Sequence, residues 1–329
     1  MTFQRRVIAL GSVAGVLLVA FILGQVFSPQ RMNRVASGSP FFPGFRAADA
    51  TKIEISDASS KVALTKGGGT WTISLGGTAY PASGMHIATL LDELGKLTKG
   101  SFVTRSADQA AELGVTGSEA THLVVSGANG STLCELDAGK TSATSSGRYI
   151  RAGKSNDVYQ TAEALTSYLT ARQNFWEDLR VFPSDLKSEQ AIRVSVRSAL
   201  TLSGKKGKRT VDYTLTQTQD AQGKSSWSFG GPSSEKASSD KVKSLLDGLF
   251  AFEGNDFDTS PDAAAKVAAA PQATVVVSTS DNRDFTLQIG AWVTGDQYPC
   301  VIKGQSVTYL VPEWRIEQAL AARDSLTGQ

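Results

Sequence analysis

The chain has 329 residues, of which 41% are hydrophobic and 19% charged, a composition typical of globular rather than disordered proteins. Its 33 basic and 31 acidic residues leave a net charge of only +2, which gives no reason to expect a nucleic-acid partner or another acidic partner. Two cysteines and two histidines are too few for a disulfide framework or a zinc cluster. We therefore expect no metal and no cofactor.

The first element is an uncharged hydrophobic segment, residues 7–27. A helix of this length rises about 30 Å, the thickness of the hydrocarbon core of a bilayer. A cleaved signal peptide is the alternative, but the apolar run is longer than such peptides need and no small-residue cleavage site follows it. We interpret the segment as an uncleaved transmembrane signal-anchor, preceded by a short cytoplasmic N-terminus at residues 1–6.

Arginines lie on both sides of this segment. Arg5 and Arg6 precede it and favour a cytoplasmic N-terminus under the positive-inside rule, whereas Arg31 and Arg34 follow it and weaken that signal. We expect a single-pass membrane protein whose remaining chain is extracytoplasmic. Residues 28–41 then form a linker.

The rest of the chain contains an internal duplication. A Phe-Pro pair opens each copy, at residues 42–43 and 182–183, and an alternating, strand-like stretch follows after roughly ten residues. We place the first repeat at residues 42–181 and the second at residues 182–323. A tail at residues 324–329 follows.

Each copy continues with a tryptophan strand and an amphipathic helix. Trp71 and Trp227 lie at matching positions, where they either fill the core or line a ligand-binding surface, and we favour the core. Ser83 and Ser238 stand at matching N-cap positions. The helices share a face with i, i+3, i+4, i+7 spacing, formed by Ile87, Leu90, Leu91 and Leu94 in the first copy and by Val242, Leu245, Leu246 and Leu249 in the second.

The later part of each copy is rich in strands. A valine-rich strand precedes a strand that ends at Gly139 or Gly290, and residues 148–153 then align with residues 300–304. We expect about six or seven strands and two or three helices per copy. Strands joined by short turns indicate a mostly antiparallel sheet with helices packed on one face. The predicted fold class is therefore α+β, with two tandem, homologous units.

Four polar residues are the first candidates for a site. His86 lies in the first amphipathic helix and His122 begins a strand, and neither has a matching histidine in the second copy, so we expect ordinary surface or strand-end histidines. Asp92 and Asp247 match between the copies. They form either a pair of related acidic sites or the polar side of each helix, and we favour the polar side.

Two further pairs are weaker candidates. Cys134 and Cys300 lie on strands at positions that are not equivalent, so buried free thiols are favoured over a disulfide. Tyr149 and Arg151 either contact a ligand or pair along an edge strand, and we favour the edge pair. We find no P-loop, no dinucleotide-binding glycine pattern, no zinc-protease motif and no nucleophile elbow. We therefore expect no catalytic residue and no enzyme.

The order of these features resembles a known family. After the Trp71 strand come Tyr-Pro-Ala at residues 80–82, Glu-Leu-Gly-Val at 112–115, Tyr-Ile-Arg at 149–151 and Val-Tyr at 158–159. This order resembles the membrane proteins known as domain of unknown function 4340, although the second copy departs from the first two motifs. The resemblance implies a protein of the bacterial inner membrane with a periplasmic domain and an accessory, non-catalytic role beside an ABC-type transporter of the gliding-motility kind.

Three hypotheses for function follow. The leading one is a binding or scaffold protein that contacts the lipid bilayer through residues 7–27 and an ABC transporter permease or another envelope protein through its duplicated part. The second is an envelope enzyme that uses carboxylates such as Asp92 or Asp247, which requires converging acidic groups with raised pKa values. The third is a purely structural envelope spacer.

Overall fold

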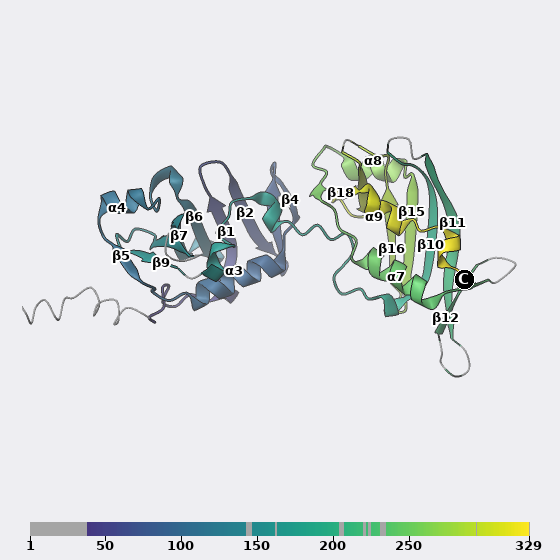
Figure 1. The fold of residues 1–329 in the computed structure, drawn as a ribbon, viewed down its shortest axis with the longest axis horizontal. Coiled ribbons are helices and arrows are strands. Elements are labelled where there is room, and N and C mark those ends of the chain that lie inside the picture. Colours follow the sequence, from purple (N-terminus) through teal and green to yellow (C-terminus); the bar gives the residue numbers. More distant parts are fainter. Residues whose placement is uncertain are drawn as a thin grey trace, which may run out of the picture. The chain divides into compact units, whose positions relative to one another are not determined.

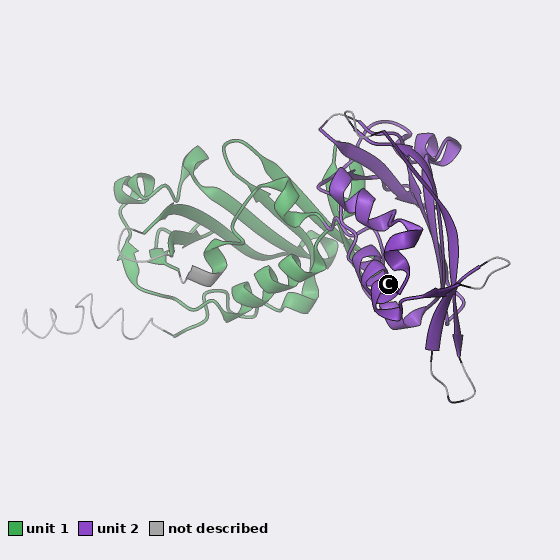
Figure 2. Cartoon of the chain, turned by 45° about the vertical axis from the view of Figure 1, so that its right-hand side comes forward, with its two compact units in different colours: residues 1–177 green, residues 178–329 purple. Residues whose placement is uncertain are grey.

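The chain divides into two compact units, residues 1–177 and residues 178–329 (Figure 2). The computed structural model describes residues 38–142, 147–161, 163–203, 207–219, 222, 225–230, 235–293 and 295–328. The expected membrane anchor, residues 7–27, lies outside the described residues. Among the helices that are described, none combines the length and the hydrophobicity needed to cross a membrane.

The first unit contains a sheet, four short or medium helices and three 3-10 turns in its described part (Figure 1). Its strands are β1 (Ala50–Ser56), β2 (Lys61–Gly67), β3 (Thr70–Leu75), β4 (Thr78–Pro81), β5 (Phe102–Thr104), β6 (Thr121–Gly127), β7 (Thr132–Thr141), β8 (Arg148–Ala152) and β9 (Val158–Gln160). Its helices are α3 (Gly84–Lys96), α4 (Ala107–Glu112), α5 (Glu163–Thr166) and α6 (Gln173–Trp176), with 3-10 turns η1 (Ala47–Asp49), η2 (Gly117–Glu119) and η3 (Ala128–Gly130).

The second unit repeats this plan. Its strands are β10 (Ala191–Thr201), β11 (Lys208–Gln219), β12 (Ser225–Phe229), β13 (Lys236–Ala237), β14 (Asp256–Phe257), β15 (Ala273–Thr279), β16 (Asp284–Ile289), β17 (Gln297–Ile302) and β18 (Tyr309–Pro312). Its helices are α7 (Ser239–Phe250), α8 (Ala263–Ala269) and α9 (Glu313–Ala319), with 3-10 turns η4 (Ser188–Gln190) and η5 (Arg323–Leu326).

The two sheets have the same topology. The strand order is β4-β3-β2-β1-β6-β7-β8-β9-β5 in the first unit and β13-β12-β11-β10-β15-β16-β17-β18-β14 in the second, and every pairing is antiparallel. The predicted α+β class with antiparallel sheets is therefore confirmed. The expected six or seven strands per unit are too few, because β4, β5, β13 and β14 are edge strands of only two to four residues, too short to show an alternating pattern.

The hydrogen-bond register allows the two units to be compared residue by residue. Leu136 pairs with Ala152 on β8, and the matching Leu287 pairs with Ile302 on β17. Ala152 is therefore equivalent to Ile302. The sequence comparison, which matched Gly153 with Gly304, is shifted by one residue here, because the glycine turns after the two strands have different lengths.

The amphipathic helices cover one face of each sheet. All eight predicted apolar positions of α3 and α7 are buried, which confirms that face. The Ser83 hydroxyl accepts a hydrogen bond from the backbone N–H of His86 at 3.3 Å, so the first predicted N-cap is confirmed. Ser238 is the N-cap residue of α7, as predicted, but its side chain makes no capping hydrogen bond.

The opposite face of the first sheet is also partly covered. Val158 pairs with Arg151 and therefore shares its face of the sheet, where it packs with Ala110 of α4 and Val115. The turn after α4 crosses β7 at Gly139, where an added Cβ atom would lie 2.2 Å from the carbonyl oxygen of Leu113. The expectation that helices pack on one face only is thus wrong, since glycine permits a second layer here.

The second unit has the same arrangement at the equivalent glycine. A Cβ atom on Gly290 would lie 3.2 Å from Val267 of α8 and 2.9 Å from Pro299 of β17. Helix α8 therefore lies on the face of the sheet opposite α7 and α9 (Figure 2).

In each unit, backbone hydrogen bonds join the start of the main helix to residues near the C-terminal end of the unit. The backbone N–H of Ser83 donates to the carbonyl of Trp176 at 2.7 Å, and the N–H of Ser238 donates to that of Leu326 at 2.9 Å. Bridges between residues 82 and 177 and between residues 237 and 327 extend both contacts. Part of the expected C-terminal tail thus packs within the second unit.

Candidate functional site

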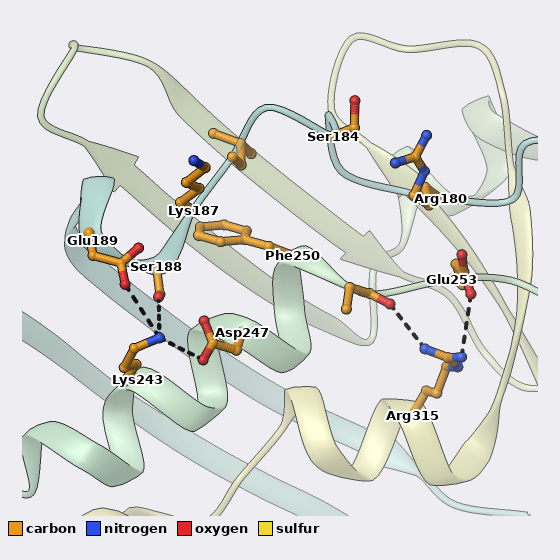
Figure 3. A pocket seen from close by; sticks show the side chains of 12 residues that line it. Arg180, Ser184, Lys187, Ser188, Glu189, Lys243, Asp247, Phe250, Glu253 and Arg315 are labelled. Atoms are coloured by element: carbon orange, nitrogen blue, oxygen red, sulfur yellow. Dashed lines mark hydrogen bonds and ion pairs between the residues drawn. The ribbon is translucent and has the colours of Figure 1, made fainter. Parts of the chain in front are cut away.

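The second unit carries a surface groove with a volume of about 570 Å³ (Figure 3). Its walls come from the segment that leads into β10, from α7 and the residues after it, and from α9. The lining residues are Arg180, Ser184, Leu186, Lys187, Ser188, Glu189, Lys243, Asp247, Phe250, Ala251, Glu253 and Arg315.

Lys243 organises one end of the groove. Its ammonium Nζ lies 2.9 Å from Asp247 Oδ2 one helical turn away, 3.0 Å from Ser188 Oγ and 3.4 Å from Glu189 Oε1. The hydrogen bond from Lys243, followed by that from Ser188, lowers the pKa of Asp247 below its ordinary value. The carboxylates of Asp247 and Glu189 therefore share the ammonium group of Lys243 as their cationic partner.

Arg315 occupies the other end. Its Nη1 donates to the carbonyl of Ala251 at 3.0 Å, and its Nη2 lies 3.6 Å from Glu253 Oε2. The guanidinium also lies over the Trp314 ring, 4.7 Å from the centroid, and that ring is 53% exposed. The negative charge of the Glu253 carboxylate is therefore balanced by Arg315, which also lines the groove.

The third wall carries hydrogen-bond donors. Arg180 donates through Nε and Nη2 to the Asp178 carboxylate, both at 3.1 Å. The Lys187 ammonium and the Ser184 hydroxyl make no hydrogen bond or ion pair with any described residue. Phe250, the last residue of α7, points its ring toward this wall and forms an apolar floor (Figure 3).

The first unit lacks most of these charges. The strand register and the helix N-caps identify the residues of the first unit that are structurally equivalent to the seven charged groove residues. In chain order, these equivalents are Pro40, Arg46, Ala48, Ala88, Asp92, Thr98 and Leu165. Only Arg46 and Asp92 carry charge. Because the scaffold is the same in both units, the charged groove is a property of the second unit and not a requirement of the fold.

The two matched aspartates therefore lie in different surroundings. Asp92 is 56% exposed and forms an ion pair with Lys96 on the same helix. Asp247 lines the groove, but its pKa is lowered, whereas an acid catalyst needs a raised one. The residues that accompany Asp247 come from three separate segments, and no spacing in the sequence links them.

A second charged cluster lies on the first sheet, on the face that α4 partly covers. His122, Asp137 and Arg151 are cross-strand neighbours on β6, β7 and β8. Asp137, 8% exposed, accepts from Arg151 Nη2 at 2.6 Å and lies 2.7 Å from His122 Nδ1, while His122 Nε2 is 3.9 Å from Glu135. The equivalent trio in the second unit is Thr274, Gln288 and Val301.

The sequence singled out His122 and Arg151 separately and missed Asp137, because only the strand register brings the three together. Tyr149 packs beside the cluster of apolar side chains under α4. His86 has a packing role: its ring stacks on Phe175 at 4.5 Å, and its Nδ1 lies 2.7 Å from the Phe175 carbonyl oxygen.

The remaining candidate residues differ in how deeply they are buried. Trp227 is buried, whereas Trp71 is half-buried with the Lys66 ammonium 6.0 Å from its ring centroid. Cys134 and Cys300 are buried free thiols, and burial raises the pKa of Cys134 to about 12. No group of three or more potential ligands able to hold a metal ion occurs among the described residues.

Comparison with known proteins gives one match. A family model described as "Domain of unknown function (DUF4340)" matches residues 71–274, from the first tryptophan strand to β15. No curated protein matches the chain, and no solved structure matches it. Because the matched region covers more than half of the chain and both units contribute to it, the chain belongs to the DUF4340 family.

Proposed function

We propose that this protein is a membrane-anchored, extracytoplasmic binding or scaffold protein that serves as an accessory component of an ABC-type transport system in the bacterial envelope. The observation that carries the proposal is the charged groove of the second unit, because five of its seven charged residues have uncharged counterparts in the first unit. The hydrophobic sequence of residues 7–27 supports a single-pass anchor in the inner membrane, with both units on the periplasmic side.

The groove is better suited to binding than to acid–base chemistry. Its three carboxylates are paired with Lys243 or Arg315. Both histidine rings of the chain lie outside it, and their hydrogen-bond partners are a backbone carbonyl and a carboxylate. Within the groove the Ser188 hydroxyl lies 3.0 Å from Lys243, but the hydrogen bond to Asp247 raises the pKa of that lysine, so its amine stays protonated and is a poor general base.

The test is affinity purification of the full-length chain from bacterial membranes in mild detergent, with the recovered proteins quantified by mass spectrometry. We expect a transporter permease and its ATPase to be recovered with the wild type and to decrease with Lys243→Ala. Lys96→Ala is the matched control, since it removes a lysine that pairs one turn away with the equivalent aspartate. Recovery of the wild-type protein without transporter subunits would refute the proposal.

A further inference from the structure

One wall of the groove carries hydrogen-bond donors that other groove residues do not use. Lys187 offers an ammonium group, Ser184 a hydroxyl and Arg180 its remaining Nη1, none of which is used by a described groove residue. These three groups follow one wall of the groove (Figure 3).

Each carboxylate of the groove already has a cationic partner. Glu189 and Asp247 bind the ammonium of Lys243, and Glu253 binds the guanidinium of Arg315. A cationic ligand would have to compete with these internal cations for the same carboxylates. An anionic ligand would find unused donors, and charge-assisted hydrogen bonds are the stronger kind.

The floor of the groove sets a second requirement. Phe250 lies between the wall that carries Lys187 and Arg180 and the ion pairs of α7 and α9 (Figure 3). Leu186 is a second buried apolar residue that lines the groove. A ligand that fills the groove must therefore place an apolar group over the aromatic ring. Lys187 and Arg180 lie on either side of Phe250 in this view, so a ligand that contacts both cations passes over the aromatic ring (Figure 3).

We propose that the groove of the second unit binds an extended acidic peptide segment of a partner protein, with carboxylates at Lys187 and Arg180 and an apolar side chain over Phe250. This inference rests on the proposed binding function and identifies the chemistry of the partner. The first unit is not expected to bind such a segment, because Pro40 replaces Arg180 and only one of the two cations therefore has a counterpart there.

The test is fluorescence anisotropy of the purified full-length chain in detergent with two labelled, capped peptides, Glu-Glu-Phe-Glu-Glu and Lys-Lys-Phe-Lys-Lys. We expect saturable binding of the acidic peptide, weakened by salt, and no binding of the basic one. The double variant R180Q/K187Q is expected to weaken binding by about tenfold or more. The double variant R46Q/K96Q in the first unit is the matched control and should bind like the wild type.

A charge-reversal variant distinguishes loss of the binding site from failure of the second unit to fold. R180E/K187E should lose the acidic peptide and gain the basic one, which an unfolded second unit cannot do. Absence of saturable binding of the acidic peptide, equal binding of both peptides, or an equal loss in the control variant would each overturn the inference. Recovery of a transporter by purification together with failed peptide binding would overturn this inference alone, whereas recovery of no partner would overturn the proposed function.

Discussion

Gly139 on β7 is the position at which the second helical layer of the first unit can be tested most directly. The turn after α4 crosses the strand there, and the backbone N–H of Lys140 donates to the carbonyl of Leu113 at 2.9 Å. We predict that Gly139→Ala forces this turn away from the sheet. The substitution changes no charge and leaves the opposite, α3-covered face of the sheet untouched.

The magnitude follows from the contacts of the added methyl group. It would lie 2.2 Å from the Leu113 oxygen and 2.8 Å from the Gly114 carbonyl carbon, more than about 1 Å too close in the first case. Backbone atoms cannot turn aside as a flexible side chain can. We therefore expect a loss near the upper end of the overpacking range, about 3 kcal/mol in the free energy of unfolding of the first unit.

Two other glycines provide graded controls. Gly290→Ala in the second unit meets side-chain atoms at 2.9 and 3.2 Å, so its cost should be smaller, about 1 kcal/mol. Gly248→Ala lies in α7 with nothing within 4 Å of the new methyl group, and it should stabilise by about 0.5–1 kcal/mol.

The assay is urea unfolding combined with hydrogen–deuterium exchange, read by mass spectrometry over residues 107–141. Gly139→Ala should speed exchange in this segment while α3 remains protected. If Gly139→Ala were as stable as the wild type, the turn after α4 would not lie against β7, and the two-layer description of the first unit would be refuted.

Three further predictions concern buried or paired groups. Asp137→Asn should lower the free energy of unfolding of the first unit by about 1–3 kcal/mol, measured in urea, because Arg151 and His122 lose a buried carboxylate partner. The pKa of Asp157 is lowered mainly by its hydrogen bond from Arg105. The ionised carboxylate therefore stabilises the first unit at neutral pH, and this effect is lost as the pH falls through the lowered pKa. The difference in free energy of unfolding between wild type and Asp157→Asn should shrink below about pH 4. Cys134 and Cys300 should resist a thiol reagent at pH 8 in the native chain and react after unfolding.

Each of these predictions has a result that would contradict it. An unchanged stability of Asp137→Asn would mean that the charges on that face of the first sheet interact with water rather than with one another. A stability difference for Asp157→Asn that stays constant from pH 7 to about pH 3 would show that its ion pair does not set the pH dependence. Rapid labelling of either cysteine in the native chain would show that its strand is accessible to solvent.

The helices and the duplication could be predicted from the sequence because their signals are local. The apolar face of α3 repeats within thirteen residues, and the same face recurs in α7. The matched tryptophans anchor equivalent strands, since Lys66 pairs with Trp71 and Gln217 pairs with Trp227. Local patterns of this kind can be recognised without knowing how the strands pair.

The charged groove could not be predicted in this way. Arg180, Lys243 and Arg315 come from segments separated by more than sixty residues, and each looks like an ordinary surface charge in its own segment. The cluster around Asp137 required the cross-strand register of three strands, and a register error of one residue would have placed Arg151 on the opposite face of the sheet. Interactions of this range are set by the tertiary fold.

The strand order has a consequence for how each unit reaches its native state. Strands β1 to β4 are neighbours in sequence and in the sheet, but β1 also pairs with β6, which begins at Thr121, far beyond the end of β1 at Ser56. The edge of β1, with Ile53 and Ile55, stays open until that long loop closes. Because β10 and β15 repeat the arrangement, closure of the central pair should be the slow step in folding both units, and the half-formed sheets are the species most prone to aggregate.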